Sequence, residues 1–243
     1  MESRIHIKEE EEIPYEVLYS RANELITSSE DEKYLDPEAL IRFLRAREMK
    51  VDNALEMWRH WMEWRKSYRA DEITELEVMP QIETGQAFWH GHDNQGRPCL
   101  IVRTRFHWPG QFPMDNMIRY CIYLVEIGIR LADESGNGQI CVIYDRGQMT
   151  EANRDPELIG TMKRLSGMLQ DYYAERLGAL YVLHVNWIYW LMYQAVKPML
   201  QKKTRNKVHV LRNINGLRDH FSPDQLLMEY GGTNDYEHPY PRK

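Results

Sequence analysis

The spacing of hydrophobic residues changes about a third of the way along the chain. In the first part they recur every three or four residues, which predicts amphipathic helices. One helix should start at Asp36-Pro37, because Asp36 offers a capping side chain and proline fits the first helical position. A second helix, capped by Asp52, carries a tryptophan stripe typical of packed core. We therefore expect residues 1–78 to form an acidic tail, at residues 1–12, and a helical lobe.

From residue 81 onward, short apolar runs alternate with helical patterns. Unbroken apolar runs are typical of strands whose two faces are both covered. Two of the runs flank Asp93-Asn94-Gln95-Gly96, which resembles a hairpin turn. The alternation predicts an α/β domain over residues 79–243. The expected strands are residues 86–90, 99–103, 140–144, 179–185 and 207–211, and the expected helices are residues 114–132 and 155–173.

The stretch from residue 185 to residue 212 is unusual in its composition. Residues 185–200 form a helix-like run that is mostly apolar or aromatic, and Lys197 is its only charged residue. A membrane span needs roughly 20 apolar residues, so this run is too short. Residues 201–212 are basic without any acid, and include Lys202, Lys203 and Arg205. The combination suits an element that touches an anionic bilayer, but a buried helix followed by a solvated turn fits the pattern equally well.

Composition limits the class of protein. The chain has 243 residues, of which 43% are hydrophobic, and this is ordinary for a globular protein. Its net charge of −6 argues against nucleic-acid binding by bulk electrostatics. Cys99, Cys121 and Cys141 are far apart among apolar residues, which indicates free thiols in a reducing compartment. We see neither a signal peptide nor a membrane-spanning run, so a cytoplasmic protein is expected.

The common catalytic motifs are missing from the sequence. We find no glycine-rich phosphate loop, no nucleophile elbow and no Cys–His spacing suited to a metal. His90 and His92 lack an evident third ligand. Asp145 follows a predicted strand without a partner base, so capping or an ion pair is favoured over catalysis. The sequence indicates a binding protein without a cofactor or metal, and not an enzyme.

Several motifs, in order, resemble the CRAL-TRIO family of lipid-transfer proteins over roughly residues 36–235. No single motif would identify the family on its own, but the presence of all of them in the family's order is specific. The first are Leu-Ile-Arg-Phe-Leu-Arg-Ala-Arg at residues 40–47 and Trp64-Arg65-Lys66; the others are Gly96-Arg97-Pro98, Glu175-Arg176-Leu177-Gly178, Val196-Lys197-Pro198 and Glu229-Tyr230-Gly231-Gly232-Thr233.

The resemblance implies a fold and a ligand. It implies a small helical lobe packed on an α/β domain, whose sheet floors an apolar pocket for one lipid. A gating helix at residues 185–200 would enter membranes through Trp187, Trp190 and Leu191. Family members that carry phosphatidylinositol use an arginine, a glutamate, a threonine and a lysine around its headgroup. The matching residues are Arg47, Glu175, Thr204 and Lys207.

The chemistry of these four residues agrees with that role. Arginine, lysine and threonine side chains can donate to phosphate, and a glutamate can accept from inositol hydroxyls. Each also has an ordinary structural alternative. Arg47 and Lys207 would be solvated surface charges, Thr204 would cap a turn, and Glu175 would pair with its neighbour Arg176.

The chain departs from the family pattern at three places. Ala174 replaces a proline, and His184-Val185-Asn186 replaces Asn-Ala-Pro at the start of the gate. Positions that some relatives use for phosphatidylcholine hold residues without hydroxyls, which argues against that second ligand. These positions are Leu100, Ile140 and Val142.

We therefore expect a monomeric lipid-transfer protein that binds phosphatidylinositol and possibly a second lipid, and that touches anionic membranes transiently. Three alternatives remain open. One is a carrier or sensor of a small isoprenoid-like ligand, another is an enzyme acting at Asp145, and the third is a scaffold that transfers nothing.

Overall fold

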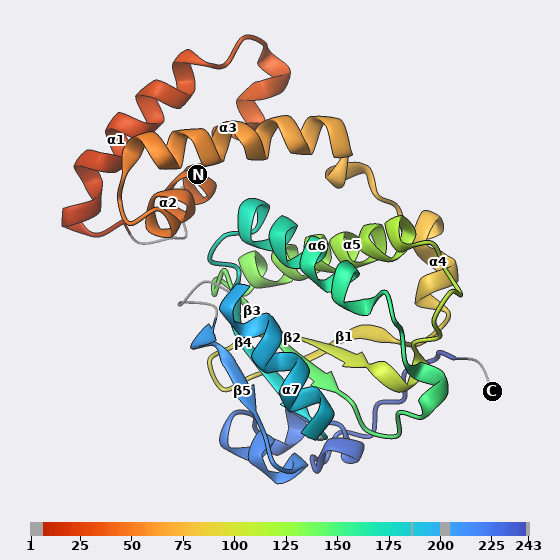
Figure 1. The fold of residues 1–243 in the computed structure, drawn as a ribbon. Coiled ribbons are helices and arrows are strands. Elements are labelled where there is room, and N and C mark those ends of the chain that lie inside the picture. The colour runs from red at the N-terminus through yellow and green to blue at the C-terminus, as the bar shows by residue number, and fades with distance from the viewer. Residues whose placement is uncertain (1–6, 186, 200–204, 242–243) are drawn as a thin grey trace. The chain divides into compact units, whose positions relative to one another are not determined.

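The computed structural model describes residues 7–185, 187–199 and 205–241 (Figure 1). The chain divides into two compact units. A helical unit comprises Met1–Glu72 together with Gly167–Glu175, and an α/β unit comprises Ile73–Ser166 and Arg176–Lys243. The predicted domain boundary after residue 78 stays a prediction. The hydrophobic pattern contains no sign that residues 167–175 group with the first helices.

Among its described residues, the helical unit contains three complete helices and the end of α6 (Leu158–Tyr172). The complete helices are α1 (Glu9–Glu24), α2 (Pro37–Ala46) and α3 (Val51–Tyr68), with 3-10 turns at Ser29–Tyr34 and Ala70–Glu72. The predicted cap of α2 is confirmed, because the Asp36 carboxylate accepts from the backbone N–H groups of Glu38 and Ala39. The predicted cap of α3 is wrong. Asp52 lies inside that helix, and its carboxylate accepts from Arg21 at 2.6 Å.

Helix α1 begins at Glu9, so residues 9–12, which we expected in an acidic tail, form its first turn. Carboxylates in this position favour a helix because they face its positive end. The Glu11 side chain also accepts from the backbone N–H of Lys8 at 3.1 Å and from two nitrogens of Arg45 at 2.8 and 2.6 Å. The ion pair with α2 fixes the start of α1.

The pair formed by Glu11 and Arg45 should make the stability of the helical unit depend on pH. Hydrogen bonds from Arg45 lower the pKa of Glu11 from 4.5 to about 2. A lowered pKa stabilises the fold above the unfolded value of 4.5, and this contribution is lost as pH falls toward 2. Glu11→Gln should therefore cost on the order of 2 kcal/mol of unfolding free energy at pH 7, and much less near pH 3.

Urea unfolding at both pH values measures this difference. Glu16→Gln is the matched control, because Glu16 is an exposed residue of the same helix. A Glu11→Gln penalty that is equal at pH 7 and pH 3 would contradict the ionic origin of the effect.

Tryptophans of α3 form the core of the helical unit, as their spacing predicted. Trp58 is fully buried, and its indole N–H donates to the carbonyl of Tyr34 at 2.8 Å. Trp64 stacks on Tyr68 and on Tyr172, with ring centroids 5.2 and 4.2 Å apart. Tyr172 is the last residue of α6 (Leu158–Tyr172), so the end of that helix completes the core.

A five-stranded sheet forms the α/β unit, with the strands in the order β1-β2-β3-β4-β5. The first pair is antiparallel and the other pairs are parallel. All five predicted strands are present, although β4 starts and ends two residues earlier than expected. The strands are β1 (Ala87–His92), β2 (Pro98–Arg103), β3 (Ile140–Asp145), β4 (Leu177–Leu183) and β5 (Val208–Val210).

The helices of this unit include α5, which the amphipathic pattern predicted, and α4, which it did not. They are α4 (Glu75–Ile82), α5 (Met114–Glu134) and α7 (Trp187–Val196), together with the first part of α6, up to Ser166. The 3-10 turns are Thr104–Phe106, Glu151–Asn153, Lys197–Met199, Ile214–Asp219, Pro223–Gln225 and Met228–Tyr230. Within the described residues, no helix combines the length and apolarity needed to cross a membrane.

The two faces of the sheet are covered to different extents. One face carries buried side chains such as Ile143 and Tyr181, and it packs against Phe221 and other apolar residues of the C-terminal segment. The opposite face carries the alternate residues of each strand. Its side chains are only half-buried at Val142, Tyr144, Leu180, Val208 and Val210. An incompletely covered apolar surface therefore extends from β3 to β5.

Candidate functional site

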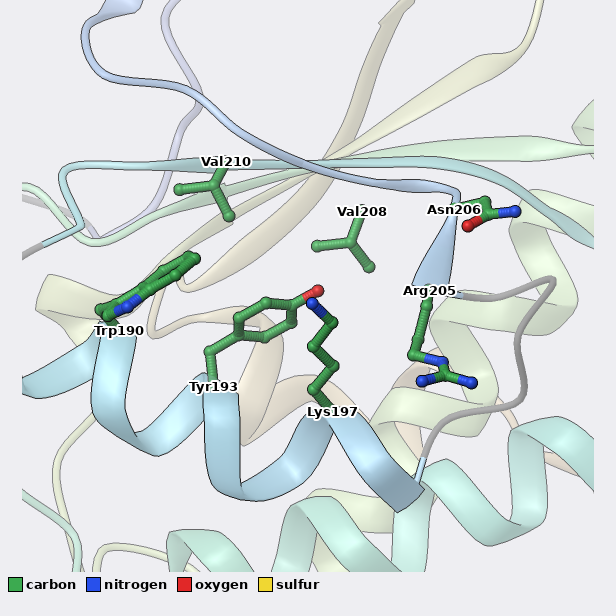
Figure 2. A pocket seen from close by; sticks show the side chains of 7 residues that line it. All are labelled: Trp190, Tyr193, Lys197, Arg205, Asn206, Val208 and Val210. Atoms are coloured by element: carbon green, nitrogen blue, oxygen red, sulfur yellow. The ribbon is translucent and has the colours of Figure 1, made fainter.

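A pocket of about 490 Å³ lies between α7 and β5 (Figure 2). Val208 and Val210 both face it, because alternate residues of a strand point to the same side. Tyr193 and Lys197 lie three and seven positions after Trp190, so the three share one side of the helix and its 3-10 extension. The lining residues are Trp190, Tyr193, Lys197, Arg205, Asn206, Val208 and Val210.

The pocket changes from apolar to cationic along its length. Figure 2 shows Trp190 and Val210 at one end and Arg205 and Asn206 at the other, with Tyr193 and Lys197 between them. The Lys197 ammonium lies 5.9 Å from the centre of the Tyr193 ring. The pocket therefore offers apolar surface to one part of a ligand and donors to another.

The predicted gate residues form an exposed apolar surface on α7. The exposed fractions are 75% for Trp187, 49% for Trp190 and 65% for Leu191. Large apolar side chains at such exposure are typical of surfaces that contact a partner or a membrane. The helix occupies most of the predicted range of residues 185–200, and entry into a membrane stays a prediction.

The four predicted headgroup residues are divided between the two units, and their meeting around one headgroup stays a prediction. Arg47 is the half-buried C-cap of α2, and Glu175 lies in a turn with φ of 60°; both belong to the helical unit. Glu175 adds to the raised pKa of Arg45, whose main cause is the hydrogen bond to Glu11. Lys207 belongs to the α/β unit, and Thr204 lies outside the described residues.

Two of these residues have neighbours that bear on their predicted roles. The guanidinium of Arg176 pairs with Asp133, which argues against the expected alternative of a local pair between Arg176 and Glu175. Lys207 directly precedes Val208, and its carbonyl accepts from the backbone N–H of Leu180 at 2.8 Å. Lys207 does not line the pocket described above.

Sequence reasoning missed three polar residues of the pocket, Lys197, Arg205 and Asn206. The sequence revealed the basic run, but it did not show which residues of that run face the pocket. That choice depends on where β5 starts and on the path of the chain leading into it. The absence of acidic residues from residues 185–212 was the signal that could have indicated an anion-binding role.

A second polar cluster surrounds Asp145 at the end of β3. One carboxylate oxygen lies 2.8 Å from Nδ1 of His184 and accepts from the Gly147 N–H at 2.7 Å. The other accepts from Arg105 at 3.0 Å and from the Tyr230 hydroxyl at 3.1 Å. Burial, together with the charge of Asp145, raises the pKa of Tyr230.

These contacts confirm the ion-pairing role expected of Asp145. Both of its oxygens have two partners and the residue is buried, so it lacks an exposed oxygen for a substrate. His184 follows β4, has φ of 54° and precedes α7 by three positions. The cluster therefore anchors the start of the predicted gate, where the sequence departs from the family pattern.

The chain matches two family models. One, described as the CRAL/TRIO domain, covers residues 82–232, and the other, the CRAL/TRIO N-terminal domain, covers residues 5–60. The chain belongs to the CRAL/TRIO family. This confirms the resemblance and the predicted α/β fold class. A CRAL/TRIO domain thus contains the sheet, α7 and the pocket.

Two curated relatives illustrate the family. The CRAL-TRIO domain-containing protein C3H8.02 of Schizosaccharomyces pombe is 28% identical over 85% of this chain and 48% of its own length. The phosphatidylinositol/phosphatidylcholine transfer protein SFH9 of Arabidopsis thaliana is 27% identical over 82% of this chain and 37% of its own length. The chain thus spans less than half the length of these relatives.

A solved structure supports the fold. The crystal structure of Sfh5 covers 96% of this chain and 90% of its own, with a TM-score of 0.74 and 17% identity. At this identity the likeness concerns the fold alone. Relatives of this CRAL/TRIO chain include proteins named for phosphatidylinositol transfer.

Proposed function

We propose that the chain binds one phospholipid, phosphatidylinositol, and exchanges it with membranes. The observation that carries this proposal is the pocket between β5 and a helix that exposes Trp187 and Leu191. A helix whose outer side is apolar and whose inner side covers a pocket can contact lipid while the pocket opens. The names of relatives such as SFH9 point to the same ligand.

The mechanism needs no chemical energy. A lipid that enters water exposes its chains at about 0.8 kcal/mol per methylene group, which makes spontaneous escape from a bilayer slow. A lipid that passes directly from bilayer to pocket exchanges one apolar environment for another. The half-buried side chains of Val142, Leu180 and Val208 supply apolar surface of this kind.

We assign the headgroup to the four residues that match the family pattern. Arg47, Thr204 and Lys207 would donate to the phosphate, and Glu175 would accept from inositol hydroxyls. The protein would act as a monomer in the cytoplasm and touch anionic membranes transiently.

Mass spectrometry of lipids extracted from the purified protein tests the ligand. We expect phosphatidylinositol in a ratio near one per chain. An isoprenoid-like molecule would support the alternative of a small-ligand carrier. A pocket that stays empty after incubation with phosphatidylinositol vesicles would contradict the proposal and favour a scaffold.

The exposed tryptophan of the gate should control the transfer rate. Trp187→Asp should slow transfer between vesicles about tenfold or more, since burial of a large apolar side chain contributes about 1.5–3 kcal/mol. Trp187 does not line the pocket, so binding should persist. Trp108→Asp is the matched control, because Trp108 is 50% exposed and lies outside α7. Equal transfer rates for the two variants would exclude α7 as the membrane contact.

A further inference from the structure

The cationic end of the pocket contains one buried donor that lacks an acceptor among the described residues. Arg205 Nε is buried and has no hydrogen-bond partner among the residues that the structure describes. Native proteins satisfy nearly all buried polar groups, so such a nitrogen calls for an explanation. None of the seven lining residues is acidic, and Lys197 adds a second positive charge. This end of the pocket is therefore built to receive an anion.

The two cations come from opposite walls of the pocket. Lys197 begins the 3-10 turn that extends α7, whereas Arg205 and Asn206 lead into β5. In Figure 2 the Lys197 side chain points up from the helix, and the Arg205 side chain points down from the segment that leads into β5. An anion between them would neutralise both charges and connect the helix to the sheet.

The rest of the pocket defines the other part of the ligand. Trp190, Val208 and Val210 offer an apolar wall that continues from the cationic end. A volume of about 490 Å³ lies in the range of pockets for drug-sized ligands, roughly 300–1,000 Å³. A volume of this size has room for a single apolar chain of a ligand.

We propose that Lys197 and Arg205 bind the acidic group of a single-chain anionic amphiphile, whose chain lies along Trp190, Val208 and Val210. This names the chemical class of the second ligand. The inference rests on the proposed lipid-binding function but uses a different set of residues from the phosphatidylinositol headgroup. By bridging α7 and β5, such a ligand holds the gate closed.

Binding of two ligands that differ only in charge tests the proposal. Oleate should bind the full chain roughly ten- to a hundredfold more tightly than oleyl alcohol, because charged hydrogen bonds add to the same apolar contact. Lys197→Met and Arg205→Met should each remove most of this difference and leave oleyl alcohol binding unchanged. Oleoyl lysophosphatidic acid replaces the carboxylate by a phosphate ester, and its affinity relative to oleate identifies the preferred acid.

Two further measurements make the outcome decisive. Arg212→Met, which removes an exposed charge outside the pocket lining, should bind oleate like the parent protein. Phosphatidylinositol loading of the parent protein is measured in parallel. If the parent protein loads phosphatidylinositol, but neither oleate nor lysophosphatidic acid binding depends on Lys197 and Arg205, the inference is overturned and the proposed function stands. Charge-dependent amphiphile binding without phosphatidylinositol loading supports the inference and overturns the proposed function.

Discussion

Lys207→Ala and Glu175→Ala should each reduce phosphatidylinositol loading about ten- to a hundredfold. Each substitution leaves a polar group of the bound headgroup without its partner. In a closed site, the loss of a charged hydrogen bond costs on the order of 1.5–3 kcal/mol. The measurement is the amount of phosphatidylinositol retained after incubation with mixed vesicles, compared with the parent protein.

Matched controls separate this loss from misfolding. Arg212→Ala removes an exposed charge soon after β5, and Glu48→Ala removes an exposed carboxylate from the helical unit. Both control variants should load phosphatidylinositol like the parent protein. All variants should bind ligands without an inositol headgroup like the parent protein. An equal loss of every ligand would indicate damage to the fold. Unchanged phosphatidylinositol loading would place the headgroup at other residues.

Asp145→Ala should lower the unfolding free energy by about 3–5 kcal/mol, because it breaks a buried ion pair and leaves other donors without their acceptor. The guanidinium of Arg105 would retain Glu229, at 2.9 Å, but would lose its buried partner. The Gly147 N–H and the Tyr230 hydroxyl would also lose their acceptor. Urea unfolding followed by circular dichroism measures the change.

His184→Ala is the companion variant for this measurement. The His184 side chain is 46% exposed, so its loss should cost less than about 1 kcal/mol. A small effect for both variants would mean that the cluster around Asp145 contributes little to the α/β unit. A large effect for both would assign the stability to the contact between the two side chains.

The fold was largely predictable because its strongest signals are local. Unbroken apolar runs identified β3 and β4, since parallel strands need apolar residues on both faces. Asp36-Pro37 marked the start of α2 through contacts that span only three residues. Helix α5 was evident from its single apolar face.

The places where the structure differs from the predictions have causes that are distant in the sequence. Glu11 is held by Arg45, 34 positions later, so the start of α1 depends on the packing of two helices. Aspartate is a residue type that can cap a helix such as α3, but the Asp52 carboxylate instead accepts a hydrogen bond from Arg21. Arg205 and Asn206 line the pocket because of the path that the chain takes into β5, and residue types alone do not determine this path.

The stacking of Trp64 on Tyr172 has a consequence for synthesis of the chain. The helical unit draws on residues 167–175, which the ribosome adds about a hundred residues after Glu72. At about 5–20 residues per second, the interval is roughly 5–20 s. Throughout it, the Trp64 ring lacks its closest stacking partner. The helical unit therefore completes its core late, and the nascent chain carries an uncovered aromatic surface that a chaperone could bind.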